Sequence, residues 1–497
     1  MSQARIRLWP ALTPSRISPN LYGHFAEHLG RCIYEGIWVG PRSRIPNEGG
    51  MRLDVLAALR HLRAPVVRWP GGCFADDYHW RDGIGSVKER PATVNLWWQQ
   101  GEPNEFGTDE FMRFCAALRC APYLCCNVGS GTPREARDWL EYCNFGGESA
   151  LSRARAQNSS PEPYGVKYWG LGNESWGCGG RFRGHEYAKE YVRFAGYLRA
   201  LDPSIELIAC GTSCDNYKNP VLNAWNHDFC QEMQHPDLID HLSMHRYFTR
   251  GSGTKFSDAE YHALFADVGT LEQDLKLADA VLTYFYPHKF VGIAIDEWGV
   301  WHPEATVENG LEQAHTLRDA VLAGTVLNLL NRWSHRVSMA NLAQAVNVLQ
   351  CLAVTGGGRM FLTPTYHVFD LMRPHMGAHL VTQELECPAF EAHPIGLSAK
   401  KSIPVLDVSA SRVGGKLLMT VSNQSVDQGI ETAIELREAQ IASVTGRVLH
   451  SEDPRDCNSF QAPKTVIPRR LKLTPVAGAL VHVFPAHSFT ALSITLG

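Results

Sequence analysis

The segment Val166-Lys167-Tyr168-Trp169-Gly170-Leu171-Gly172-Asn173-Glu174 is a short, mostly apolar run that ends in an amide and a carboxylate. Seven other short runs of this kind occur along the chain. In chain order, the eight runs are residues 21–25, 66–68, 122–126, 166–171, 205–210, 238–244, 289–295 and 337–340. Apolar runs without polar alternation are typical of strands that are buried on both faces, as in parallel sheets.

Segments with helical spacing separate these runs. Residues 185–201 place aromatic and aliphatic side chains on one face, residues 268–285 contain a second helical pattern, and residues 311–333 are expected to form one long helix. Buried strands that alternate with helices predict an α/β fold, and eight of them favour a (β/α)8 barrel over an open doubly wound sheet.

The two ends of the chain have a different pattern. Residues 4–9, 405–411, 416–422, 479–484 and 489–496 alternate between apolar and polar side chains, and Gly, Pro, Asn and Asp separate these strings. We therefore expect a C-terminal antiparallel β-sandwich, jelly-roll-like, over residues 374–497. The barrel is expected over residues 20–373, with residues 1–19 supplying an N-terminal strand to the sandwich.

Composition excludes several classes of protein. The chain has 497 residues, 44% of them hydrophobic and 20% charged, with a formal net charge of −4 and no basic run, so a nucleic-acid partner is not expected. No apolar window is long enough to span a membrane, and residues 1–19 lack the pattern of a secretory signal. A cytoplasmic location is expected, and with it fourteen reduced, mostly buried cysteines that do not form CxxC pairs.

Two glutamates at strand ends indicate the chemistry. Glu174 closes the fourth run and Glu297 the seventh, and the two strand ends face each other across the mouth of an eight-stranded barrel. Retaining glycoside hydrolysis requires two carboxyl groups about 5–5.5 Å apart, one as nucleophile and the other as acid/base. Asn173 is placed to hydrogen-bond the sugar 2-hydroxyl beside the reacting carbon.

Other strand ends carry further polar groups, and tryptophans follow both glutamates. The polar groups are Glu27, His28, Arg68, Asn127, His245, Tyr247, Asn341 and Gln344. Trp176, Trp298 and Trp301 either stack on a sugar ring or belong to the core, and the sequence favours neither.

Several longer stretches of the sequence resemble the motifs of one known family. Residues 23–34, 68–74, 78–85, 104–111, 168–174 and 296–298 resemble motifs of the glycoside hydrolase family 51 α-L-arabinofuranosidases, in order and with similar spacing. The similarity extends over residues 20–369. It implies a barrel with a C-terminal β-sandwich, retention of configuration, no cofactor or metal, and often a homohexamer.

The resemblance also implies roles for individual residues. Glu174 corresponds to the acid/base and Glu297 to the nucleophile. Other positions correspond to groups around the arabinofuranose, and these are Glu27, Asn173, Tyr247 and the supporting Arg68. Cys73 stands where many members carry asparagine, which is expected to change one sugar contact, and the loop of residues 94–107, with Trp97 and Trp98, is expected to cover the site.

The favoured function is an exo-acting α-L-arabinofuranosidase that acts on arabinan- or arabinoxylan-derived oligosaccharides. A β-xylosidase or endoglucanase on the same barrel is an alternative, as is a non-catalytic carbohydrate-binding protein. A metal-dependent hydrolase would need His24, His28, His245 and Asp296 to converge, and the first strand lacks a His-x-His pair. Linkage preference, substrate length and oligomeric state are left open.

Overall fold

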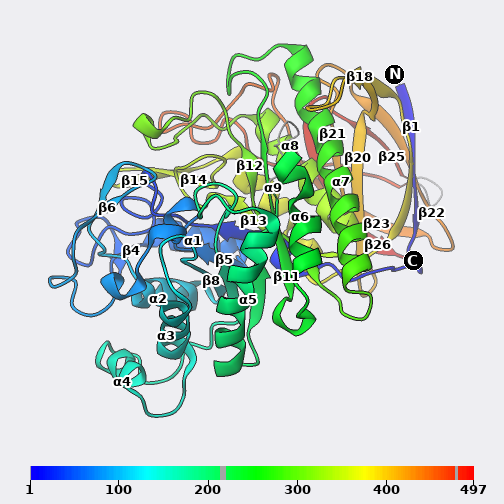
Figure 1. Cartoon of the computed structure of the whole chain (residues 1–497). Coiled ribbons are helices and arrows are strands. Elements are labelled where there is room, and N and C mark those ends of the chain that lie inside the picture. Colours follow the sequence, from blue (N-terminus) through cyan, green and yellow to red (C-terminus); the bar gives the residue numbers. More distant parts are fainter. Residues whose placement is uncertain (1, 213–219, 476–479) are drawn as a thin grey trace.

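A closed barrel of eight parallel strands forms the larger domain (Figure 1). The computed structural model describes residues 2–212, 220–475 and 480–497. The barrel strands are β2 (Gly23–Phe25), β5 (Val66–Trp69), β8 (Ala121–Cys126), β9 (Tyr168–Leu171), β10 (Glu206–Ala209), β11 (His241–Phe248), β12 (Gly292–Val300) and β13 (Val337–Ala343). Each contains part of one of the eight apolar runs, and β13 closes the barrel by pairing with β2. The predicted (β/α)8 barrel is confirmed.

Helices follow the barrel strands and cover the outside of the barrel. They are α1 (Leu53–Leu62), α2 (Thr108–Leu118), α3 (Pro133–Asn144), α4 (Ala150–Gln157), α5 (Gly184–Leu201), α6 (Pro220–Glu232), α7 (Asp258–Phe285), α8 (Leu317–Arg332) and α9 (Pro364–Met372). The patterns in residues 185–201 and 268–285 lie within α5 and α7.

The helix expected over residues 311–333 begins later than predicted. Leu311 has a φ of 57°, which a right-handed helix cannot contain. The Asp319 carboxylate then accepts a hydrogen bond from the Thr316 backbone N–H (3.2 Å), so α8 starts at Leu317 with a carboxylate at its positive end. The apolar composition of the segment did not reveal this start.

Two sheets form the smaller domain, and most of their strand pairs are antiparallel. One sheet has the order β17-β1-β22-β25 and the other β16-β20-β21-β26-β23-β24. The bounds are β1 (Ser2–Trp9), β16 (His379–Leu380), β17 (Thr382–Glu386), β20 (Leu406–Val413), β21 (Lys416–Asn423), β22 (Ile430–Leu436), β23 (Ile441–Leu449), β24 (Arg469–Leu471), β25 (Leu480–Phe484) and β26 (Ser488–Leu496). Ala479, the first residue of one expected strand, lies outside the described residues.

The first strand of the chain lies in this smaller domain. β1 pairs in parallel with β22 and antiparallel with β17, and its inward-facing Ile6 and Leu8 are fully buried. Both chain ends lie on the sandwich side of the molecule (Figure 1).

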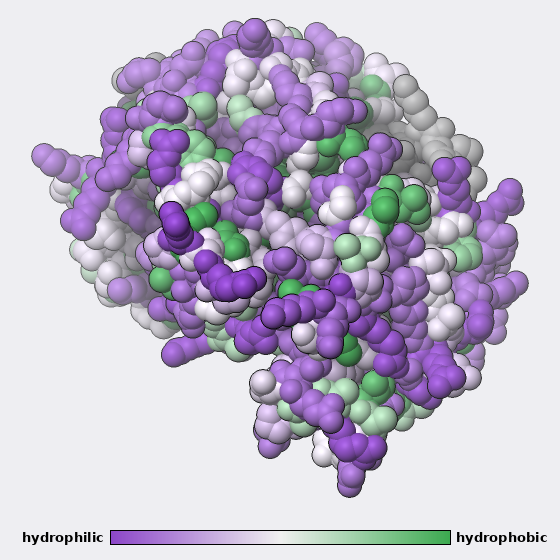
Figure 2. All heavy atoms as spheres, turned by 90° about the vertical axis from the view of Figure 1, so that its left-hand side faces the viewer, coloured by the Kyte–Doolittle hydropathy of each residue, from purple (hydrophilic) through white to green (hydrophobic). Residues whose placement is uncertain are grey.

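Four short hairpins complete the strand inventory. They are β3 (Asn47–Glu48) with β4 (Met51–Arg52), β6 (Thr93–Asn95) with β7 (Gln100–Glu102), β14 (Ala353–Gly356) with β15 (Arg359–Leu362), and β18 (Ala389–Ala392) with β19 (Lys401–Pro404). Hydrophilic side chains cover most of the face shown in Figure 2, where hydrophobic groups form small separate patches. Among the described residues, no helix is both long and apolar enough to cross a membrane.

Helix α8 joins the two domains. The Arg332 guanidinium binds the Asp407 carboxylate (2.7 Å) and donates to the Val408 carbonyl. In the same helix, Gly324 lies against the Phe489 ring of β26. The domains therefore share a packed interface, in keeping with the near-complete burial of α8.

We predict that Gly324→Ala destabilises the protein. An added Cβ would lie 2.4 Å from Phe489 ring carbons, and overpacking of this kind costs about 1–3 kcal/mol. Gly196→Ala is the matched control, because that helical glycine in α5 has no such neighbour within 4 Å and alanine there raises stability by up to about 1 kcal/mol. Calorimetric melting temperatures of both variants test the pair; an unchanged value for Gly324→Ala would mean that the interface is loosely packed.

Candidate active site

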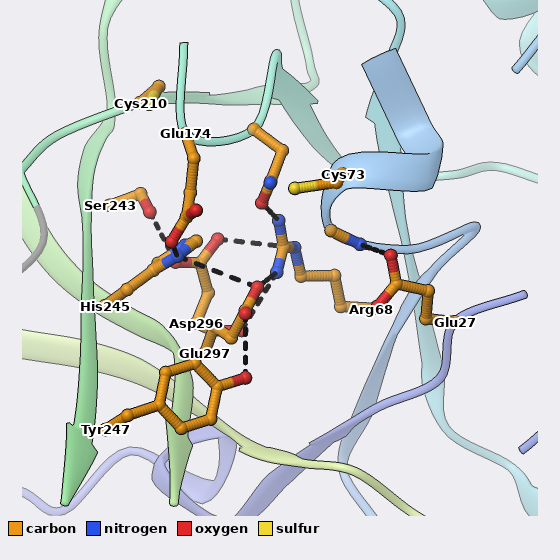
Figure 3. Close-up of polar contacts among 12 residues, drawn as sticks. Glu27, Arg68, Cys73, Glu174, Cys210, Ser243, His245, Tyr247, Asp296 and Glu297 are labelled. Atoms are coloured by element: carbon orange, nitrogen blue, oxygen red, sulfur yellow. Dashed lines mark hydrogen bonds and ion pairs between the residues drawn. The ribbon is translucent and has the colours of Figure 1, made fainter. Parts of the chain in front are cut away.

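Two glutamates meet at the carboxyl ends of the barrel strands (Figure 3). Glu174 follows β9, and Glu297 lies in β12. One oxygen of each carboxylate and a ring nitrogen of His245 all lie within 4.8 Å of one another. Glu174 adopts a φ of 44°, a left-handed conformation that few residues other than glycine adopt and that is common at functional sites. The barrel has thus brought together two residues that are distant in the sequence.

Both oxygens of Glu297 have a firm partner. The Arg68 guanidinium donates to Oε2 (2.9 Å), and the Tyr247 hydroxyl donates to Oε1 (2.8 Å). Arg68 also donates to the Asn173 side-chain oxygen (2.5 Å) and is almost completely buried. Charge-assisted hydrogen bonds of this kind hold the Glu297 carboxylate in one orientation.

Asp296, next to Glu297, contacts the same two basic side chains, Arg68 and His245. Its carboxylate accepts from Tyr123 (2.7 Å) and Ser243 and lies 3.4 Å from His245 Nε2. Burial alone would raise the pKa of Asp296, but Arg68 and His245 hold it below its usual range. Asp296 is therefore ionised throughout the physiological pH range.

His245 is a functional residue whose role the sequence did not reveal. Its Nδ1 is 2.9 Å from Glu174 Oε1. Burial alone would lower the pKa of His245, but the negative charge of Glu297 and the contacts with Asp296 and Glu174 raise it to about 10. An imidazolium therefore donates to Glu174 at neutral pH. The sequence indicated His245 as a candidate only through its position at the end of a barrel strand.

Asp76 holds the loop that carries Glu174. Its buried carboxylate accepts backbone hydrogen bonds from Asn173 (2.7 Å), Val128 (2.8 Å) and Gly129 (3.1 Å). Burial raises the pKa of Asp76 to about 6, although these N–H groups oppose the shift. Sequence reasoning missed Asp76 because it lies in the 3-10 helix Cys73–Asp77 and not at a strand end.

Glu27 forms another wall of the site. Its Oε1 accepts from the Gly72 backbone (3.0 Å) and from Trp98 Nε1 (3.0 Å), and its Oε2 accepts from Gln344 (3.0 Å). Burial raises the pKa of Glu27 to about 7, and the charge of Glu297 acts in the same direction. Trp98 lies on the loop that the family resemblance implied would cover the site, and it reaches the site.

The prediction of reduced cysteines was wrong for one pair. Cys73 and Cys178 form a disulfide, and 105 residues separate them in the sequence. No local sequence motif predicts this disulfide, because only the fold brings the loops after β5 and β9 together. Cys73 therefore faces the site as half of a disulfide and not as a free thiol; Cys214 lies outside the described residues.

The three tryptophans do not behave alike. Trp298 is 1% exposed and its ring packs near that of Phe369. Trp176 and Trp301 are half-buried. The Trp301 ring meets that of Tyr247 edge-on at 5.2 Å, which places it beside the site.

The histidines of the metal-hydrolase alternative do not converge. The His24 ring is buried and packs near the Phe369 ring (5.1 Å between centroids). His28 Nδ1 is 2.7 Å from the Glu102 carboxylate. Only His245 and Asp296 of that set lie beside the two glutamates.

Comparison with known proteins agrees with this geometry. The family described as "Alpha-L-arabinofuranosidase 1 domain" matches residues 58–255, and "Alpha-L-arabinofuranosidase C-terminal domain" matches residues 296–488. An "Intracellular exo-alpha-L-arabinofuranosidase" of Bacteroides ovatus is 37% identical over 490 residues, which cover 96% of this chain and 93% of that protein. The chain belongs to the α-L-arabinofuranosidases of glycoside hydrolase family 51.

Solved structures of this family have the same architecture. The family 51 arabinofuranosidase from Xanthomonas axonopodis pv. citri is 34% identical, with a TM-score of 0.93 and complete coverage of both chains. The α-L-arabinofuranosidase from Thermotoga maritima, solved as an arabinose complex, is 34% identical, with a TM-score of 0.89 over 99% of this chain and 100% of that chain. This family 51 member is thus a glycoside hydrolase with a barrel and a sandwich.

We predict that His245 stabilises the fold most at low and neutral pH. Its pKa is about 10 in the folded protein and about 6.5 in an unfolded chain, so the folded state binds the proton more tightly. The stabilisation is complete below about pH 6.5 and is lost as the pH rises through 10. The difference in free energy of unfolding between wild type and His245→Gln should therefore shrink from pH 6.5 to pH 10.

Denaturant unfolding at several pH values measures this difference. His288→Gln is the control, because His288 is exposed and away from the site. A wild-type advantage that stays constant from pH 6.5 to pH 10 would contradict an imidazolium at position 245.

Proposed function

We propose that this family 51 enzyme hydrolyses terminal α-L-arabinofuranosides by double displacement, with Glu297 as the nucleophile and Glu174 as the acid/base. The observation that carries the assignment is the approach of the two carboxylates, which have oxygens within 4.8 Å of each other. Inverting enzymes separate their carboxyl groups by about 6.5–9.5 Å to admit a water molecule, whereas retaining enzymes keep them at about 5–5.5 Å.

The surroundings of Glu297 suit a nucleophile. Arg68 and Tyr247 hold its two oxygens, so the carboxylate needs little reorientation before attack. Attack forms a bond from a Glu297 oxygen to the anomeric carbon while the bond to the leaving oxygen breaks.

The surroundings of Glu174 suit a proton donor and acceptor. Its side chain is 21% exposed, against 11% for Glu297, and hydrogen-bonds His245. In the first step Glu174 gives its proton to the leaving oxygen, and the His245 imidazolium stabilises the carboxylate that results. Esterification of Glu297 then removes a neighbouring negative charge, and Glu174 takes a proton from the water that cleaves the ester.

Glu27, Asn173 and Glu297 surround the backbone of Gly72. A Cβ on Gly72 would lie 3.2 Å from Glu297 Oε2 and 3.5 Å from both Asn173 Nδ2 and Glu27 Oε1. A side chain at position 72 would therefore crowd these three groups, which the glycine avoids. We assign Glu27 and Asn173 to the sugar hydroxyls, with Trp176 and Trp301 at the rim and Cys73 beside Asn173.

The substrate is an arabinose-containing glycan, and we propose the short oligosaccharides derived from arabinan or arabinoxylan. The name of the Bacteroides ovatus relative supports an intracellular place for this chain as well. We further propose a homo-oligomer, a hexamer by family resemblance, and chemistry that uses no cofactor, metal or nucleic acid.

Chromogenic glycosides test the specificity and the nucleophile. We expect release of p-nitrophenol from the α-L-arabinofuranoside, little from the β-D-xyloside or β-D-glucoside, and loss of nearly all turnover in Glu297→Ala. Glu162→Ala is the control, because that glutamate is exposed in the loop before β9. If only the xyloside or the glucoside is hydrolysed, the enzyme is a β-xylosidase or a glucosidase. Full activity of Glu297→Ala would refute the assignment of Glu297 as the nucleophile.

A second variant tests the acid/base. Glu174→Ala should slow hydrolysis of substrates with poor leaving groups by roughly 10²–10⁴-fold, the usual contribution of general acid catalysis. Aryl substrates with good leaving groups should be less affected. Azide should partly restore turnover and yield an arabinofuranosyl azide with the anomeric configuration of the substrate, detectable by NMR; absence of this product would contradict the assignment.

A further inference from the structure

The Cys73–Cys178 disulfide lies directly against Glu174. The two sulfur atoms and one Glu174 carboxylate oxygen all lie within 4.8 Å of one another. All three residues are only partly buried, so solutes can reach them. Cys178 Sγ is also 3.7 Å from the Asn173 side-chain nitrogen. The disulfide is therefore part of the wall beside Glu174, and its chemical state affects that carboxylate.

Reduction of the disulfide would place two thiols beside the Glu174 carboxylate, and together these groups form a set of metal ligands. A dithiol or a phosphine supplies two electrons, and with two protons the disulfide becomes two thiols. The backbones of the two cysteines are already close, with 5.5 Å between their Cα atoms. Two thiolates and a carboxylate are ligands that Zn²⁺ accepts, with water in the fourth position of a tetrahedron.

We propose that the reduced Cys73–Cys178 pair, with Glu174, is an inhibitory binding site for a soft divalent cation such as Zn²⁺. The cation displaces the two thiol protons and binds both sulfurs and a Glu174 oxygen. Inhibition follows because a coordinated Glu174 cannot exchange a proton with the leaving group. This last step rests on the proposed role of Glu174, whereas cation binding does not.

The charges around the site are mixed. Two nearby carboxylates, those of Glu297 and the buried Asp76, add negative potential. Asp76 lies against the loop that carries Cys178, because its Oδ2 would be only 2.1 Å from a Cβ on Gly179. Arg68 and the His245 imidazolium oppose a cation. Binding of the cation therefore requires the two thiolates. The oxidised protein, which lacks them, serves as the control.

Zinc binding is measured first, without reference to activity. The full-length enzyme is reduced with a phosphine, desalted under argon, and titrated with Zn²⁺ against a chromogenic chelator, in parallel with oxidised enzyme. We expect one additional Zn²⁺ per chain in the reduced form, bound at least tenfold more tightly than any Zn²⁺ in the oxidised form. Cd²⁺ should produce a thiolate-to-metal absorption band only in the reduced form.

Variants locate the site. Cys178→Ser should abolish the additional binding, and Glu174→Gln should weaken it at least tenfold while the thiolate absorption with Cd²⁺ persists. Cys120→Ser is the matched control, because Cys115 and Cys120 form another close thiol pair away from the barrel mouth, and this variant should retain the binding. Equal Zn²⁺ binding by reduced and oxidised wild type would overturn the proposal, a comparison that does not depend on whether a variant folds.

Turnover is measured second. Zn²⁺ should abolish arabinofuranoside hydrolysis by the reduced enzyme in proportion to occupancy, with recovery on addition of chelator, while the oxidised enzyme keeps its activity. Zn²⁺ that binds the cysteines without loss of turnover would overturn the inhibitory part of the proposal. A failed Glu174→Ala azide test would overturn the acid/base assignment but would leave the zinc titration unaffected, so the two failures are distinguishable.

Discussion

The guanidinium of Arg68 is the group on which the rest of the site depends. It is buried at the end of β5 and contacts Asn173 beyond β9 and both Asp296 and Glu297 of β12. A buried cation of this kind is stable only when carboxylates or carbonyls surround it, so the strand ends that supply these groups must converge on it. The barrel provides that convergence, since parallel strands present their carboxyl ends at one rim.

Charge is distributed unevenly around the two central glutamates. Glu297 contacts a permanent cation and a neutral hydroxyl, whereas Glu174 contacts an imidazolium that Asp296 holds in place. Two carboxylates with different partners can take different roles in one reaction. Asp76 restricts the position of Glu174, because its three backbone hydrogen bonds fix the loop from which Glu174 extends.

Several features of this arrangement could be predicted from the sequence. The eight barrel strands were visible because each is buried on both faces and therefore lacks polar alternation. Glu174 and Glu297 stood out because each comes within three residues after such a run. The start of α8 was mispredicted, since nothing in the composition of residues 311–316 shows the left-handed turn at Leu311. Trp298 followed a glutamate at a strand end, yet its side chain points into the core, where it packs near Phe369.

The sequence by itself determined the fold class and the two carboxylates at strand ends, because burial imposes a local pattern on strands and helices that can be read residue by residue. Only the tertiary structure decided which side chains share the pocket: the Cys73–Cys178 bond, the Asp76 contacts and the raised pKa of His245 each join segments that are tens to more than one hundred residues apart. Hydrogen bonds and charge interactions depend on distances in space, and no spacing along the chain encodes those distances.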